Sequence, residues 1–100
     1  MNATEYEIQW TEKAVSLLEQ IKDTALRSRI AARAERLKTE PGKQGEPLKY
    51  ALSGLYSTPV ARRYLIIYEV KEDEPVVIIH AVGIHRQGDR ADVYNLVGPD

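Results

Sequence analysis

The sequence contains no cysteine among its 100 residues. This absence excludes a disulfide framework, a thiolate nucleophile and a cysteine-ligated zinc site. The two histidines have no clear carboxylate partner in the sequence, so they do not predict a metal site either. We therefore expect a protein that works without a metal ion or another cofactor.

Long apolar runs are also missing. The run from Val76 to Ile79 is far too short to cross a bilayer, and no basic-plus-apolar leader opens the chain. With 43% hydrophobic and 29% charged residues, the chain is expected to fold rather than to stay disordered. These features predict a cytoplasmic protein with a single domain over residues 1–100.

The chain lacks the basic excess that is typical of nucleic-acid-binding proteins, because it has 14 basic and 15 acidic residues. The basic residues are unevenly distributed, however, and residues 22–49 carry a local balance of +4. Arg33 and Arg36 lie in this segment and are candidates for contacts with RNA phosphates. A solvated helix face explains the same pattern equally well.

The hydrophobic pattern predicts the element order β-α-α-β-β-β. Residues 6–10 alternate between apolar and polar side chains, as a half-buried strand does. Thr11 and Asp23 are good N-caps for two helices whose apolar residues recur every three or four positions. Three further strands are expected within residues 48–59, 64–70 and 76–82. We therefore expect an α+β fold, with both helices packed on one face of a small antiparallel sheet and the other face open.

Local details follow from the same pattern. Residues 41–47 contain two prolines and two glycines and are expected to form a loop, whereas residues 48–52 alternate as a strand does. Gly83 is expected to end the last long strand. His80 shares an apolar strand face and is expected to be a packed, structural histidine.

Polar residues that suit phosphate chemistry cluster where the predicted strands begin and end. They are Glu46, Lys49, Arg62, Arg63, His85, Arg86 and Tyr94. The planar guanidinium of arginine fits phosphate oxygens, and histidine exchanges protons near neutral pH. A small sheet that carries this set is a plausible surface for binding or cutting RNA.

Three segments occur in a particular order: EPLKYALSGLY, then RRYLIIYEV with an acidic hairpin, then AVGIHR followed by DVY. In these segments the chain resembles the RelE/ParE family of type II toxin–antitoxin toxins, and the first segment is especially similar to the YoeB branch. The resemblance implies a RelE-like fold. Enzymatic members cleave mRNA, usually in the ribosomal A site and without metal, whereas ParE members poison DNA gyrase. It also implies an antitoxin partner whose C-terminal segment wraps around the toxin in a hetero-oligomer.

The resemblance assigns roles to individual residues. Glu46 matches the glutamate that YoeB-like enzymes use as general base. His85 and Arg86 fall where the family places a histidine or lysine followed by arginine, and Tyr94 matches the late tyrosine of RelE-like enzymes. These residues are the catalytic candidates.

Two positions differ from the family pattern. Leu65 stands where arginine is common, and residues 57–59 replace the usual basic residues of the second strand. Arg62 and Arg63 lie near the family's phosphate-binding arginine and are the candidates to replace it. Three functions stay open at this point: an mRNA endonuclease that acts with the ribosome, an inhibitor of DNA gyrase, and a degenerate member that only binds its antitoxin.

Overall fold

The structure is a computed structural model, and it describes residues 4–61, 63–86 and 92–97. Arg62, one of the predicted phosphate-binding residues, lies outside the described residues. In chain order the elements are β1 (Glu7–Trp10), α1 (Glu12–Glu19), α2 (Thr24–Glu35), η1 (Arg36–Lys38), α3 (Pro41–Gln44), β2 (Glu46–Pro47), η2 (Tyr50–Leu52), β3 (Leu55–Pro59), β4 (Tyr64–Lys71), β5 (Val76–Ile84) and η3 (Val93–Asn95).

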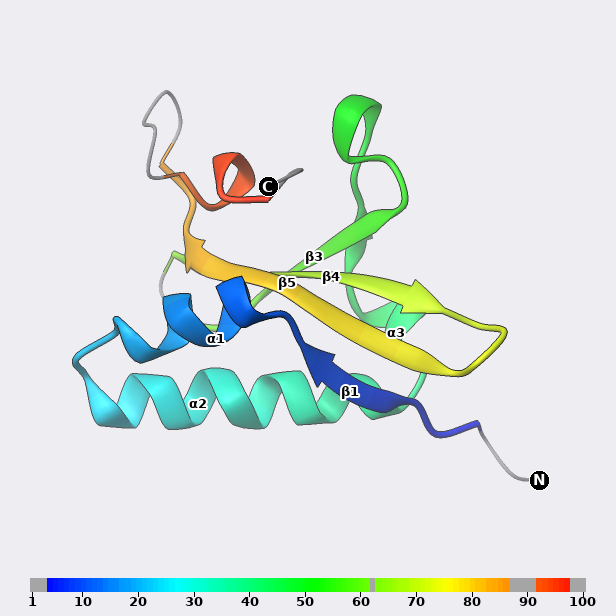
Figure 1. Cartoon of the computed structure of the whole chain (residues 1–100), viewed down its shortest axis with the longest axis horizontal. Coiled ribbons are helices and arrows are strands. Elements are labelled where there is room, and N and C mark those ends of the chain that lie inside the picture. Colours follow the sequence, from blue (N-terminus) through cyan, green and yellow to red (C-terminus); the bar gives the residue numbers. More distant parts are fainter. Residues whose placement is uncertain (1–3, 62, 87–91, 98–100) are drawn as a thin grey trace.

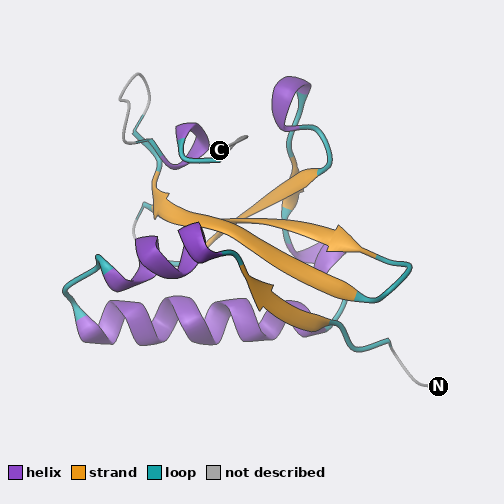
Figure 2. Ribbon diagram, in the orientation of Figure 1, coloured by secondary structure: helices purple, strands orange, loops and turns teal. Residues whose placement is uncertain are grey.

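The five strands form one sheet in the order β1-β5-β4-β3-β2, and α1 and α2 cover one of its faces (Figure 1; Figure 2). The expected α+β architecture is confirmed. The four C-terminal strands pair antiparallel, as expected, but β1 runs parallel to β5. These two strands are the first and the last in the chain, so no hairpin joins them and they are free to run parallel.

The N-terminal helices begin where the capping residues predict. The side chain of Thr11 accepts a hydrogen bond from the backbone N–H of Ala14 at 3.0 Å, and Asp23 accepts one from Leu26 at 3.1 Å. Each bond satisfies a backbone donor that the first helical turn leaves without a partner. The helix starts are therefore encoded locally in the sequence.

The main core lies between the sheet and the helices. Ile30 and Leu37 are buried there against Ile66 and Ile79 of the sheet. Tyr68 is also buried in this cluster, and its hydroxyl donates a hydrogen bond to the carbonyl oxygen of Pro41 at 2.7 Å. Burial raises the pKa of Tyr68 to about 12, so its hydroxyl stays protonated and ties the short helix α3 to the sheet.

The connection between α2 and β3 differs from the expected loop followed by a strand. Residues 41–44 form α3, because proline is well suited to the first helical position. Residues 48–52 are not a strand: β2 ends at Pro47, and η2 begins at Tyr50, whose φ of 59° is incompatible with an extended chain. The alternation in this segment was therefore misleading.

Strand β5 also differs from expectation, because it continues through Gly83 to Ile84. Val93 of η3 packs closely on this glycine, and a Cβ atom there would lie 3.3 Å from the Cβ of Val93. The pairing with β4 skips His80 at a register shift. His80 keeps the face of Ile78, because it reaches Glu69, which is directly opposite Ile78, whereas Val82 turns to the covered core. The His80 side chain is half-buried, and its Nε2 lies 3.0 Å from Oε1 of Glu69.

Candidate functional site

The site lies on the face of the sheet that α1 and α2 leave open. Glu46 of β2 is directly opposite Ser57 of β3, so the two side chains are on the same face. The hydroxyl of Ser57 lies 3.4 Å from the hydroxyl of Tyr94 in η3. The fold therefore brings the exposed Glu46 close to Tyr94, although 48 positions separate them in the sequence (94 − 46).

A buried carboxylate, Asp92, organises the C-terminal part of the site. Its side chain is within hydrogen-bond distance of His85 Nδ1, at 3.1 Å, and it accepts bonds from the backbone N–H groups of Tyr94 and Arg86. Asp92 is only 6% exposed. Burial favours the protonated acid, but the hydrogen bonds outweigh it and hold the pKa of Asp92 below its ordinary value of 3.8. The group is therefore a carboxylate at neutral pH.

This carboxylate fixes the orientation of His85. An ionised carboxyl group only accepts hydrogen bonds, so Nδ1 of His85 must carry the proton that it donates. The ring of Tyr94 packs against the imidazole edge-to-face, with ring centroids 5.0 Å apart. The His85 side chain is still 48% exposed, so its second nitrogen, Nε2, is available for proton transfer.

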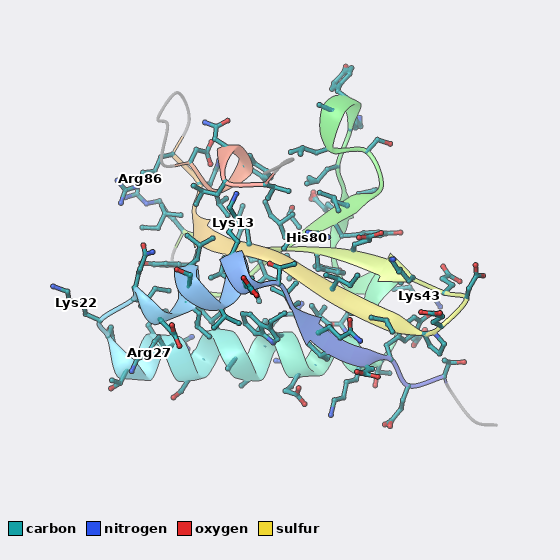
Figure 3. The ribbon with its side chains drawn as sticks, in the orientation of Figure 1. Lys13, Lys22, Arg27, Lys43, His80 and Arg86 are labelled. Carbon is teal, nitrogen blue, oxygen red and sulfur yellow. The ribbon has the colours of Figure 1, made fainter. Side chains whose placement is uncertain are left out.

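Two of the predicted cations, Arg63 and Arg86, lie beside this histidine. The carbonyl oxygen of Arg63 accepts a hydrogen bond from the backbone N–H of His85 at 3.2 Å. Together with Lys22, both arginines line a surface pocket of about 650 Å³, whose lining includes a single acidic residue, Asp23. Figure 3 shows Arg86 and Lys22 projecting at the same end of the molecule. The rest of the lining includes residues of α1 and α2, so the pocket lies on the helix side of this end of the sheet, and His85 is not part of it. The two arginines are therefore at the same end of the sheet as His85, in a pocket that suits a phosphate.

Leu65 has a structural role at the position where an arginine was expected from the resemblance. It packs against a small apolar cluster of Ile67, Ala81 and Val93, which lies between the sheet and η3. This cluster holds η3, and with it Asp92 and Tyr94, against the open face. The cations beside His85 come from the neighbouring residues Arg63 and Arg86 instead.

The remaining basic candidates do not join this group. Arg33 donates hydrogen bonds to Gln44 and to the hydroxyl of Thr58, both at 2.7 Å. Partial burial and the nearby charge of Arg36 lower the pKa of Arg33. Both arginines lie on the α2 side of the sheet, whereas Lys49 is exposed just before η2. The structure thus brings Glu46, Tyr94 and His85 together on the open face. It places Arg63 and Arg86 in a neighbouring pocket beside the helices, and Arg33 and Arg36 in neither group.

Asp92 was not among the candidates from the sequence. The signal was present in the DVY segment, because aspartate is a frequent N-cap and a frequent partner for histidine. Its seven-residue separation from His85 left that pairing unrecognised (92 − 85). Within residues 4–61, 63–86 and 92–97, no group of three or more His, Asp or Glu side chains is placed to hold a metal ion. In the same ranges, no helix is long and apolar enough to span a membrane.

Comparison with known proteins gives one family and a consistent fold. The family described as the ParE toxin of the type II toxin–antitoxin system parDE matches residues 8–88. The toxin–antitoxin complex RelBE2 from Mycobacterium tuberculosis contains a chain with 23% identity and a TM-score of 0.73, and the match covers 80% of this chain and 98% of that one. A mutant of the E. coli toxin RelE in the free state has 18% identity and a TM-score of 0.73, with coverage of 93% and 94%.

A third structure, a YoeB/ParE toxin from Agrobacterium tumefaciens, has 20% identity and a TM-score of 0.69, with coverage of 80% of this chain and 99% of that one. No curated protein matches the sequence significantly. At these identities the structural matches establish the fold, and the family match covers most of the chain.

Proposed function

The chain belongs to the RelE/ParE family of type II toxin–antitoxin toxins, and on this premise we propose that it is an endoribonuclease that cleaves mRNA without a metal ion. The observation that carries this proposal is the anchored His85. A carboxylate fixes Nδ1, a tyrosine ring supports the imidazole, and two arginines lie at the same end of the sheet. This arrangement suits acid–base chemistry at a phosphodiester.

Glu46 and His85 supply the two proton transfers that such a cleavage needs. Glu46 accepts the proton of a ribose 2′-hydroxyl as its oxygen bonds to phosphorus. The bond between phosphorus and the 5′-oxygen breaks, and protonated His85 gives its Nε2 proton to that leaving oxygen. The products are a 2′,3′-cyclic phosphate and a 5′-hydroxyl. Asp92 holds the imidazole by Nδ1, so that Nε2 is the nitrogen that meets the leaving oxygen.

The phosphate gains negative charge during the attack, and cations must stabilise it. Arg63 and Arg86 are the candidates, because both lie at the same end of the sheet as His85, where they line one surface pocket. Preorganised donors of this kind are worth about 3–4 kcal/mol each in the transition state. Tyr94 joins the two halves of the site, because its hydroxyl contacts Ser57, opposite Glu46, and its ring contacts His85.

An antitoxin is the proposed protein partner. The matched chain from M. tuberculosis was solved in a toxin–antitoxin complex. A second matched chain, with a TM-score of 0.65, comes from a YoeB–YefM complex of Staphylococcus aureus. Arg33 and Arg36 lie away from the proposed active site, on the α2 side of the sheet. There they are available to acidic residues of a partner or to an RNA backbone.

To test the proposal, the protein is incubated with ribosomes that carry a defined mRNA. A chelator is added at a concentration that removes any bound transition metal. The wild-type protein is expected to cut the message, and His85→Ala or Arg86→Ala is expected to slow cleavage by about 10²–10⁴-fold. His80→Ala is the matched control, because His80 also contacts a carboxylate but lies outside the site. Full activity of both site variants would remove the assignment. Intact mRNA together with inhibition of gyrase supercoiling would replace the nuclease with a gyrase inhibitor.

A further inference from the structure

Tyr50 is the most exposed large hydrophobic side chain among the described residues. It is 93% exposed, and the only other large hydrophobic residue counted as exposed in these ranges is Val15, at 38%. An isolated aromatic ring that is almost completely in water contributes nothing to the core. Its presence therefore needs an explanation outside the packing of the fold.

The backbone at Tyr50 makes this placement more unusual. Its φ of 59° lies in the left-handed region, which glycine and asparagine adopt readily and bulky residues avoid. The turn around it is closed by backbone hydrogen bonds only, from Leu52 to Lys49 at 3.2 Å and from Ser53 to Tyr50 at 3.0 Å. A glycine would form the same turn without strain. The tyrosine at this position thus strains the backbone, and the fold itself does not require a side chain there.

The position of η2 relates this ring to the proposed active site. Tyr50 follows Glu46 by four residues (50 − 46), so the two backbone positions are at most about 14 Å apart. Both η2 and η3, which carries Tyr94, lie on the side of the sheet away from α1 and α2 (Figure 1). RNA bound between Glu46 and His85 therefore has its flanking nucleotides within reach of η2.

The neighbours of Tyr50 fit nucleic acid better than protein. Lys49 is exposed next to it, whereas Ala51 and Ser53 are exposed but small. A protein-docking site would surround a central aromatic residue with further apolar surface. A cation beside a lone aromatic ring is instead the combination by which proteins bind single-stranded RNA, with the phosphate on the cation and the base on the ring.

We propose that Tyr50 stacks on an unpaired nucleobase next to the scissile phosphate, while Lys49 contacts the adjoining backbone phosphate. This assignment rests on the RNA-cleaving function proposed above for the identity of the substrate. The assignment adds an RNA-binding site that is separate from the residues that exchange protons. Base stacking tolerates every base, so Tyr50 contributes affinity and placement of the strand rather than sequence choice.

The test is the affinity for a short, 2′-O-methylated RNA that carries one 2-aminopurine and cannot be cleaved. Stacking quenches the fluorescence of this base, so a titration gives both the dissociation constant and the contact. Tyr50→Gly keeps the turn and removes the ring, and we expect it to weaken binding by about tenfold or more and to abolish the quenching. Tyr50→Phe is expected to bind within about twofold of the wild-type protein, because the ring is what stacks.

Val15→Ala is the matched control, because it truncates the other exposed hydrophobic side chain and is expected to leave RNA binding unchanged. Tyr50→Gly must unfold at the same temperature as the wild-type protein or higher. Equal affinity and equal quenching for Tyr50→Gly would overturn the assignment, as would a loss of antitoxin binding with RNA binding intact. The readout is separate from the proposed function, because a protein that binds this RNA through Tyr50 but never cleaves mRNA contradicts only the nuclease.

Discussion

The two faces of the sheet are stabilised in different ways. The face under α1 and α2 is closed by a continuous apolar core, which includes Ile30, Leu37 and Ile66. The open face has a much smaller apolar cluster around Ile67 and Val93, and its polar groups are arranged by hydrogen bonds to one carboxylate. The difference predicts a division of roles: the covered face should determine whether the chain folds, and the open face should determine its activity.

The first way to sharpen this comparison is to damage the covered face alone. Leu37→Ala removes a fully buried side chain, so we expect the free energy of unfolding to fall by about 2–5 kcal/mol. Cleavage per folded molecule is expected to stay unchanged, because Leu37 is buried in the core between the helices and the covered face. Chemical denaturation and cleavage assays measure the two quantities. A proportionate loss of specific activity would show that the faces are not independent.

Gly45 is the position where the two faces are linked. A Cβ atom there would lie 2.5 Å from the hydroxyl of Tyr68 in the core and 2.7 Å from the backbone oxygen of Ser57 at the site. We expect Gly45→Ala to cost about 1–3 kcal/mol of stability and to displace β2, which carries Glu46. It should therefore reduce both stability and cleavage. Gly54→Ala is the control, since nothing lies within 4 Å of a Cβ at Gly54; a change there reflects only the strain of its positive φ.

The open face is tested by removing the charge of Asp92. Asp92→Asn keeps the size of the side chain but no longer holds a negative charge against Nδ1 of His85. We expect cleavage to slow at least about tenfold, because the imidazole ring is less firmly oriented. A thermal unfolding measurement distinguishes this role from a loss of folding, because the variant should remain folded at the assay temperature. Unchanged cleavage would mean that Asp92 only caps η3.

Acid should affect the open face in a defined range of pH. The pKa of folded Asp92 is lower than its ordinary value of 3.8, so its contribution to stability is complete above that value. It is lost as the pH falls through the lower, folded-state pKa. The difference in unfolding free energy between the wild-type protein and Asp92→Asn should therefore be constant from neutral pH to about pH 5 and shrink below pH 4. If the difference in unfolding free energy grew on acidification, it would contradict a lowered pKa for Asp92.

Much of the covered face was predictable because its determinants are local. Thr11 and Asp23 predict helix starts, and the period of the apolar residues predicts which side chains are buried. The parallel pairing of β1 with β5 was not predictable, because strand partners that lie far apart in sequence leave no local pattern. The irregular segment at η2 was missed because alternation suggested a strand, and only the backbone shows that Tyr50 cannot be part of one.

The candidate site was predictable only in part. Glu46, His85 and Tyr94 were named from the sequence, and the fold brings their segments together. The contribution of Asp92 depends on its contact with His85, seven positions earlier, and its residue type alone does not identify that partner. Arg33 shows the opposite case: its residue type suggested RNA, but the side that a helix presents to the sheet is decided by tertiary packing.

The chemistry of the cut ends tests the central claim most directly. The message recovered from programmed ribosomes is to be analysed for its termini after treatment with the wild-type protein in chelator. A 2′,3′-cyclic phosphate on one fragment and a 5′-hydroxyl on the other is the result that Glu46 and His85 predict. A 3′-hydroxyl with a 5′-phosphate, or uncut message, would contradict an acid–base nuclease on the open face.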